Sequence, residues 1–309
     1  MNIRFILSGL AACAALCATP GTTRAQIFVT NETTGTIGEY TTSGVPVNTA
    51  LVSGFDSAEG SAVSGGNLFV VSVANNGSGT IGKYTTSGVP VNPALITGLS
   101  GGRAIAVSGE NLFVASDEPM SESSRIGKYT TSGATVNPAL IPNAVTLATG
   151  IAVSGDKLFV VDDANGLVAE YTTSGATVNA SLISGLTGPF GIAVSGGNLF
   201  VTDFTNGTIG EYTTSGATVN ASLVSGLNSP AGIAVSGENL FVTSEFGGTI
   251  GEYTTSGATV NAALVSGLNS PTYIAVVSAS VPDASSTWTL LLLGLTATFG
   301  LKLVLRQPA

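Results

Sequence analysis

The segment Tyr212-Thr213-Thr214-Ser215-Gly216 is one of six identical copies of the pentapeptide Tyr-Thr-Thr-Ser-Gly. The copies begin 41 to 45 residues apart, at Tyr40, Tyr84, Tyr129, Tyr171, Tyr212 and Tyr253. A repeat of this length has room for four short strands with tight turns, and it is longer than the repeat of most solenoids. The pentapeptide therefore predicts that nearly the whole chain consists of one repeated unit.

The copy from Gly191 to Leu227 shows the expected strands most clearly. Strand-forming stretches at 192–195, 198–202, 208–213 and 218–224 alternate with turns that contain glycine. The glycines at 196, 197, 207 and 216 supply the positive φ that tight hairpins need. Four-stranded sheets of this kind stack around a central axis, so the sequence predicts a β-propeller.

The two ends of the repeated region are out of phase. It opens with residues 27–30, which match the second strand of the unit, and closes with 274–277, which match the first. One blade must therefore combine strands from both ends, an arrangement that leaves no free edge in the ring. We predict an all-β, six-bladed β-propeller of four-stranded antiparallel blades over residues 26–280, with one blade closed by both termini.

Composition narrows the classes of function. The chain of 309 residues is 44% hydrophobic and 9% charged, and its formal net charge is −9, so it is far from the composition of disordered chains. An acidic protein is a poor partner for nucleic acid, whose phosphates are bound by clustered Lys and Arg. The sequence has no histidine, the commonest general base, which disfavours many enzyme classes.

Residues 1–25 have the pattern of a secretory signal peptide. Arg4 precedes an apolar run over 5–18, and a small residue, Ala25, stands at the expected cleavage position. The two cysteines, Cys13 and Cys17, fall inside this segment, so the exported protein is expected to have no disulfide. An alternative interpretation is that residues 10–13 (Leu-Ala-Ala-Cys) form a lipoprotein processing site.

The C-terminal region contains an apolar stretch at 288–305, which is interrupted only by Lys302 and followed by Arg306. Its length predicts a transmembrane helix, and the two bases indicate that its C-terminal end is cytoplasmic. The propeller is then expected outside the inner membrane. A plain membrane anchor is one interpretation of this segment.

Residues 281–309 also resemble a known sorting tag. The motif Val281-Pro282-Asp283, the apolar helix and the terminal Arg306 are similar to the PEP-CTERM signal in its Val-Pro-Asp variant. The resemblance implies an exosortase-type membrane transpeptidase as a partner, in bacteria that make extracellular polysaccharide. It also implies removal of the helix and transfer of the protein to the cell surface.

The repeated unit resembles the NHL repeat over residues 27–278. The resemblance rests on the run from Leu199 to Asp203, followed by Asn206, Ile209 and Tyr212. NHL propellers include RNA binders, protein binders and amidating lyases, and related six-bladed folds include metal-dependent lactonases. The fold alone selects none of these activities.

The loops that differ among the six copies join the fourth strand to the next first strand, or the second strand to the third. In a propeller both sets lie on one face, around the mouth of the channel. Ten acids occur in them, against only Arg103 and Arg125: Glu32, Asp56, Glu59, Asp117, Glu118, Glu122, Asp162, Asp163, Asp203 and Glu245. We predict a binding face there, with Glu59, Arg103, Asp162, Phe190, Asp203 and Tyr273 as candidate residues.

Three alternatives stay open at this face. Asp162, Asp163 and Asp203 are candidate ligands for Ca²⁺, which prefers carboxylate oxygens, but Asp in these positions also caps hairpins. Glu59 and Arg103 are expected on neighbouring blades, as a site pair or as a plain surface ion pair. Aromatic residues at 190, 204, 246 and 273 suit either sugar stacking or loop packing. The pentapeptide tyrosines, being identical, are expected to pack within the blades.

These observations predict an exported, surface-sorted and non-enzymatic binding or structural module of the cell surface or the extracellular polysaccharide matrix. Its expected partners are the sorting enzyme and either a polysaccharide or a surface protein, with no nucleic acid. The sequence identifies no catalytic residue. The alternative is a Ca²⁺-dependent propeller hydrolase or lyase, similar to lactonases, with its site at the channel mouth.

Overall fold

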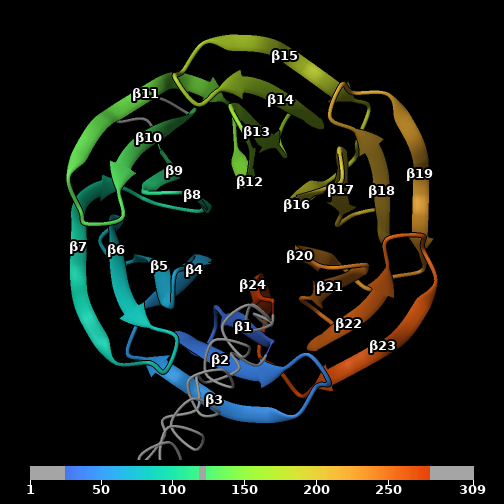
Figure 1. The fold of residues 1–309 in the computed structure, drawn as a ribbon, viewed down its shortest axis with the longest axis horizontal. Helices are drawn as coiled ribbons and strands as arrows, with labels where there is room; N and C mark the ends of the chain where they lie inside the picture. The colour runs from blue at the N-terminus through green and yellow to red at the C-terminus, as the bar shows by residue number, and fades with distance from the viewer. Residues whose placement is uncertain (1–24, 118–122, 279–309) are drawn as a thin grey trace, which may run out of the picture. The chain divides into compact units, whose positions relative to one another are not determined.

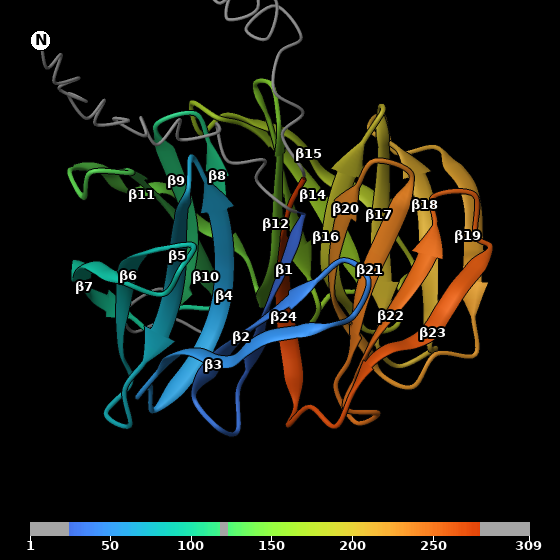
Figure 2. The ribbon, with the colours of Figure 1, turned by 60° about the horizontal axis from the view of Figure 1, so that its bottom comes forward.

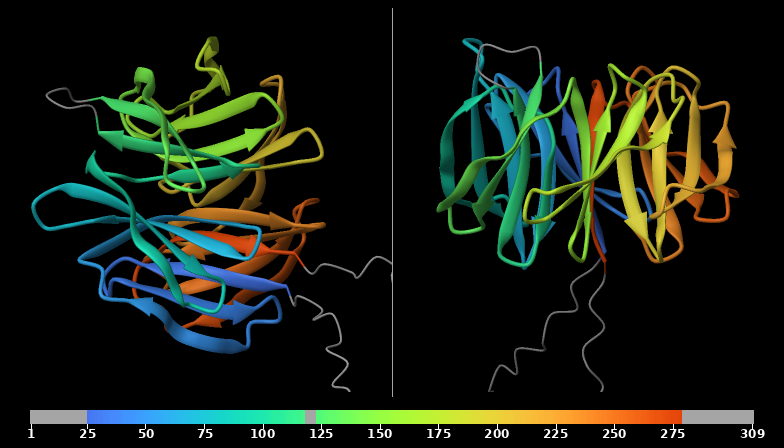
Figure 3. Two further views of the ribbon diagram at one scale, coloured as in Figure 1. Left: turned by 60° about the vertical axis from the view of Figure 1, so that its left-hand side comes forward. Right: turned by 90° about the horizontal axis from the view of Figure 1, so that it is seen from above.

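The computed structural model describes residues 25–117 and 123–278, which form six four-stranded antiparallel sheets around a central axis (Figure 1). The prediction of an all-β, six-bladed propeller is thereby confirmed. The strands run between the two faces of the ring, as the side-on views in Figure 3 show. The described residues contain no helix long and apolar enough to cross a membrane.

Each blade contributes one strand of each type. The inner strands, next to the axis, are β4 (Ser57–Ser64), β8 (Ile105–Ser108), β12 (Ala148–Ser154), β16 (Pro189–Ser195), β20 (Pro230–Ser236) and β24 (Pro271–Val277). The second strands are β1 (Gln26–Asn31), β5 (Asn67–Val73), β9 (Asn111–Asp117), β13 (Lys157–Asp162), β17 (Asn198–Asp203) and β21 (Asn239–Ser244). The third strands are β2 (Thr36–Thr41), β6 (Ser78–Thr85), β10 (Ser124–Thr130), β14 (Leu167–Thr172), β18 (Thr208–Thr213) and β22 (Thr249–Thr254). The outer strands are β3 (Pro46–Ser53), β7 (Pro90–Ser100), β11 (Thr135–Val145), β15 (Thr177–Ser184), β19 (Thr218–Ser225) and β23 (Thr259–Ser266).

The composite blade has the order β24-β1-β2-β3, as the phase of the repeats predicts. Ile27 pairs with Val276, and Phe28 pairs with Ala275, so the first and last strands lie side by side in one sheet (Figure 2). This closure leaves every inner strand paired. The described strands and core clusters all lie within residues 26–277, so this part of the chain has what an independently folding domain requires.

The hydrophobic core lies between adjacent blades. One cluster joins Phe200 and Ile209 of the blade made of β16–β19 to Leu240 and Val242 of the blade made of β20–β23. The phenylalanine of each second strand is at most 2% exposed, in the set Phe28, Phe69, Phe113, Phe159, Phe200 and Phe241. Burial of a whole aromatic ring in every interface makes neighbouring blades stabilise one another.

The pentapeptide ends the third strand and forms the turn to the outer strand. Its tyrosines are 3–7% exposed, so the prediction that they pack within the blades is confirmed. Gly210 makes room for Tyr212, because a Cβ at 210 would lie 2.7 Å from the ring atom Cε2. In the turn, Thr213 Oγ1 accepts a hydrogen bond from the backbone N–H of Ala217 at 3.0 Å. The same bond recurs in all six blades at 2.9–3.0 Å.

The outer strands are exposed along most of their length, and each contains one asparagine that bonds to its own strand. Its side-chain Oδ1 accepts the backbone N–H of the residue two positions further on, at 3.0–3.2 Å, in Asn48, Asn92, Asn137, Asn179, Asn220 and Asn261.

Several predicted features lie outside the described residues. They are the signal peptide up to residue 24, the transmembrane helix at 288–305, and the sorting signal of Val281, Pro282, Asp283 and Arg306. Glu118 and Glu122 lie in the other segment that is not described.

Candidate functional site at the channel mouth

The axial channel is narrow. It encloses about 60 Å³ and is lined by residues of all six inner strands, among them Ser61, Ile105, Ile151, Ile192 and Ile233. This volume suits water molecules and is well below the roughly 300–1,000 Å³ of typical ligand pockets. A ligand on the axis must therefore bind above the channel, at its mouth.

Close packing of the inner strands explains the narrowness. A Cβ at Gly60, Gly150, Gly191 or Gly232 would lie 2.4–2.6 Å from a carbonyl oxygen of the next inner strand. When the repeats are aligned, Tyr273 of β24 takes the position that these glycines occupy in the other strands. Its ring lines the channel, in a place where four other blades bring backbone against backbone.

One side of the mouth is charged. Arg103 Nε lies 3.6 Å from Asp117 Oδ1, and Glu59 Oε1 accepts a hydrogen bond from Ser57 Oγ at 2.9 Å. The expected Glu59–Arg103 ion pair is thus replaced by Arg103–Asp117, while Glu59 is bonded within its own strand. Arg103 Nε is buried and has no hydrogen-bond partner among the described residues.

Glu59 has an unusual environment for a carboxyl group. Burial raises its pKa to about 7, and the nearby Glu32 carboxylate adds to this increase. The Ser57 hydrogen bond and the charge of Arg103 act in the opposite direction, but they do not offset the desolvation. Glu59 therefore keeps its proton at pH values at which an ordinary glutamate is ionised.

The other side of the mouth is a continuous aromatic cluster. The Tyr273 and Phe190 ring centroids are 5.4 Å apart, those of Phe190 and Phe204 are 6.3 Å apart, and those of Phe204 and Phe246 are 5.5 Å apart. The four rings come from β24, from β16 and from two loops that follow second strands. Phe246, at the outer end of the cluster, is 71% exposed. The four candidate aromatics are thus brought together on one surface.

Asp162 and Asp203 occupy structural positions instead. The Asp162 carboxylate accepts the backbone N–H groups of Thr146 and Leu147, each at 3.1 Å, and the side-chain amide of Asn165 at 2.8 Å. The Asp203 carboxylate accepts the N–H of Thr187 at 3.0 Å and that of Asn206 at 2.9 Å. Both are Asx caps, which connect the end of a second strand to the loop before the inner strand.

This geometry favours the capping interpretation over calcium ligation. Burial raises the pKa of Asp163, and the charges of Asp162 and Asp203 contribute. Nevertheless, the described residues contain no cluster of three or more acidic, cysteine or histidine side chains that would hold a metal ion. Carboxylate oxygens that accept two or three N–H bonds have little capacity left for a cation.

Asp117 was predicted only as one of the ten acids of the mouth loops and not as a candidate binding residue. It follows Ser116 at the end of β9, one position beyond the one that holds Asp162 and Asp203 in their strands, so comparison of equivalent positions passes over it. The pairing could have been predicted from the repeat, because Asp117 ends β9 and β9 pairs with β8, the strand that directly follows Arg103.

Comparison with known proteins supports the fold and goes no further. No family model and no curated protein matches the sequence. Among solved structures, a chain of the nidogen/laminin complex has a TM-score of 0.67 and 13% identity, with 82% of this chain and 98% of that chain covered. A functionally unknown protein from Desulfotomaculum acetoxidans has a TM-score of 0.59 and 17% identity, with coverages of 83% and 86%. Virginiamycin B lyase from Staphylococcus aureus has a TM-score of 0.53 and 19% identity, with coverages of 80% and 84%.

At these identities the similarities confirm a six-bladed propeller and assign no activity. The NHL-type repeat and the PEP-CTERM tag stay predictions from the sequence.

Proposed function

We propose that this protein is an exported, non-enzymatic module that binds extracellular polysaccharide through the channel mouth of its propeller. The observation that carries the proposal is the continuous cluster of Tyr273, Phe190, Phe204 and Phe246 beside the charged group of Glu59 and Arg103.

Such a surface matches the two chemical faces of a sugar. Aromatic rings pack against the C–H face of a pyranose, while carboxylate and guanidinium groups exchange hydrogen bonds with its hydroxyls. Phe246, which packs against Phe204 on one side, is still 71% exposed and therefore offers apolar surface to a ligand. The channel below the mouth is too narrow for a small substrate, so an extended polymer lying across the mouth fits better.

The address segments support the same setting. A signal peptide at 1–25 would export the chain across the inner membrane, and a tag at 281–309 would hold it at the membrane until an exosortase-type enzyme passes it to the surface. Polysaccharide is the material that a matrix-displayed propeller meets there. A surface protein as the ligand is the other outcome that the experiment distinguishes.

The test is electrophoresis of the propeller, residues 25–278, in gels that contain the matrix polysaccharide of the producing bacterium. We expect retardation, and a loss of about tenfold in affinity when Phe204→Ala and Phe246→Ala are combined. Val219→Ala is the matched control, because Val219 is 52% exposed on an outer strand away from the mouth. Absence of retardation, or equal retardation of all variants, would refute polysaccharide binding at the mouth.

One observation keeps the enzymatic alternative as a second candidate. A carboxyl group with a pKa of about 7 is suited to general-base catalysis, and Glu59 is such a group. Lactone hydrolysis with and without Ca²⁺ tests it. Turnover that disappears in Glu59→Gln, with the fold intact, would establish the enzyme, whereas no turnover of lactones by the wild type would leave the binding module.

A further inference from the structure

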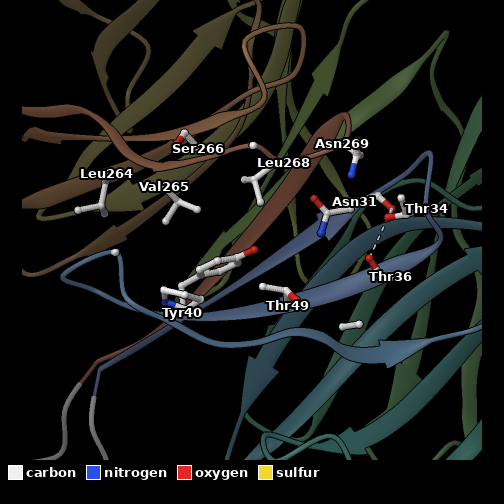
Figure 4. Close-up of a pocket in the computed structure, with 14 residues that line it drawn as sticks. Asn31, Thr34, Thr36, Tyr40, Thr49, Leu264, Val265, Ser266, Leu268 and Asn269 are labelled. Atoms are coloured by element: carbon white, nitrogen blue, oxygen red, sulfur yellow. Dashed lines mark hydrogen bonds between the residues drawn. The ribbon is translucent and has the colours of Figure 1, made fainter.

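A second hollow lies between the composite blade and the last blade, which we name the seam groove (Figure 4). Its volume is about 620 Å³, within the range of small-molecule pockets. The side chains of the composite blade face the segment that leads from β23 to β24. Polar groups from both sides line it: Asn31, Thr34, Thr36, Tyr40, Thr49 and Asn269.

The equivalent groove between the blade of β16–β19 and the last blade, β20–β23, is far smaller, about 170 Å³. Ser244 stands there where the seam has Asn31, and its hydroxyl donates to the backbone carbonyl of Asn228. In the blade before, the equivalent Asp203 accepts the N–H of Thr187. In these interfaces the side chain at the end of the second strand is bonded to the segment that leads in from the preceding blade.

Asn31 lacks that connection on its acceptor side. The residue is 4% exposed, and its Oδ1 is buried with no hydrogen-bond partner among the described residues. An unsatisfied buried acceptor destabilises the folded protein, and a ligand donor in the groove would relieve that cost. Since a half turn of the side-chain amide exchanges its donor and acceptor, Asn31 can offer either group to a ligand.

The lining indicates an uncharged ligand. Among the described residues that line the seam groove none is charged, so this lining would not neutralise a phosphate, a carboxylate or an amine. The amides and hydroxyls instead suit a ligand rich in hydroxyl groups, while Tyr40, Leu264 and Leu268 supply apolar surface against its C–H faces. A neutral sugar has this combination of groups.

The seam groove is continuous with the mouth face. A third hollow, about 450 Å³, shares the lining residues Gly267, Leu268 and Asn269 with it. That hollow is also lined by Phe246, the outermost ring of the aromatic cluster. A path of concave surface thus leads from the mouth, past Phe246, over the segment between β23 and β24, and into the seam groove.

We propose that the seam groove binds an uncharged stretch of polysaccharide, with Asn31 and Thr49 as hydrogen-bonding residues and further sugar units extending past Phe246 toward the mouth. The inference rests on the proposed function for the class of ligand, but it assigns a separate site with its own residues.

The test uses residues 25–278 and a panel of neutral linear hexasaccharides (β-1,3-, β-1,4- and α-1,4-glucans), with binding followed by NMR titration and calorimetry. Thr49→Trp fills the groove from an exposed position on β3. Its matched control is Ala262→Trp, at the equivalent position of the smaller groove. We expect at least one hexasaccharide to bind, with about a tenfold loss in Thr49→Trp and less than about a twofold change in Ala262→Trp.

The remaining outcomes are decisive as well. An Asn31→Leu variant removes the amide without changing a charge. Like Thr49→Trp, this single substitution should weaken binding. Binding that both substitutions leave unchanged overturns the seam site. If no neutral hexasaccharide binds, the seam inference is wrong, while the gel test with matrix polysaccharide still decides the proposed function through the mouth residues.

Discussion

The two faces of the ring differ in how far the six blades agree. On the face opposite the mouth, the turn between the third and outer strands repeats one sequence and one hydrogen bond six times. At the mouth, the equivalent position at the start of the inner strands varies between an acid, a base, threonine, phenylalanine and alanine: Glu59, Arg103, Thr149, Phe190, Ala231 and Thr272. The identical turns have the same structural role in every blade. A specific ligand is therefore expected to bind at the mouth, where the blades differ.

The largest expected effect comes from a substitution on the repeated face. Gly216 has φ of +89°, and a Cβ there would lie 2.4 Å from the carbonyl oxygen of Leu182 in the neighbouring blade. We expect Gly216→Ala to reduce the free energy of unfolding by about 3 kcal/mol or more, since strained backbone and a steric clash combine. Chemical denaturation measures this.

Gly196→Ala is the control for that substitution. Gly196 also has a positive φ, +58°, but a Cβ there would meet no atom within 4 Å. Backbone strain alone should cost about 1 kcal/mol. Equal destabilisation by the two variants would contradict the view that the pentapeptide turn holds neighbouring blades together.

The next effect lies at the mouth and depends on pH. Glu59 has a pKa of about 7 in the folded protein and an ordinary value of 4.5 when exposed, so the folded state binds its proton more strongly. Its contribution to stability is complete below about pH 4.5 and is lost as the pH rises through 7. Relative to Glu59→Gln, the wild type should lose roughly 3 kcal/mol between pH 4 and 8.

Thermal unfolding of both proteins across that pH range measures the difference. Parallel curves for the wild type and Glu59→Gln would show that Glu59 is solvated like an ordinary surface carboxylate. In that case the charged side of the mouth would contain no carboxyl group with a raised pKa at Glu59.

A smaller loss of stability is expected when a threonine hydroxyl is removed on the repeated face, and none when one is removed at the mouth. Thr213→Val removes the acceptor for the N–H of Ala217 and should cost about 1 kcal/mol. Thr205 lies in the mouth-facing loop of the same blade and makes no side-chain hydrogen bond among the described residues. Thr205→Val should therefore leave the unfolding midpoint unchanged, and a larger loss there than in Thr213→Val would reverse the comparison.

The smallest expected effect concerns calcium. Because Asp162 and Asp203 are saturated by backbone N–H groups, millimolar Ca²⁺ should raise the melting temperature of residues 25–278 by less than about 1 °C. Differential scanning calorimetry with and without EDTA measures the shift. A rise of several degrees that Asp162→Ala and Asp203→Ala both abolish would restore the metal site.

The fold could be predicted from sequence because its determinants are periodic. Six pentapeptides fixed the repeat, and the phase of Ile27 against Ile274 predicted the composite blade that the pairing of β1 with β24 confirms. Repetition averages out the ambiguity of any single short strand.

The sequence predicted on which face of the ring the candidate site lies, but not how its side chains pair. Loop variation located the mouth and its four aromatic residues, but the partners of single side chains depend on distances between blades. Arg103 pairs with Asp117 and not with Glu59, and the Asp162 and Asp203 carboxylates are directed toward backbone N–H groups. The seam groove was not predicted, because its volume depends on how the composite blade meets the last blade, which no single repeat encodes.

The asparagine of each outer strand has a consequence for solubility. Exposed edge strands usually avoid pairing with other molecules because they contain lysine or proline. The charge repulsion that lysine provides is weakened by salt. Here Asn179, Asn220 and Asn261 each engage an edge N–H with an uncharged amide, on strands without a charged residue or proline. Protection of this kind does not depend on ionic strength or on pH. The protein should therefore stay dispersed at high concentration over a wide range of salt concentration and pH.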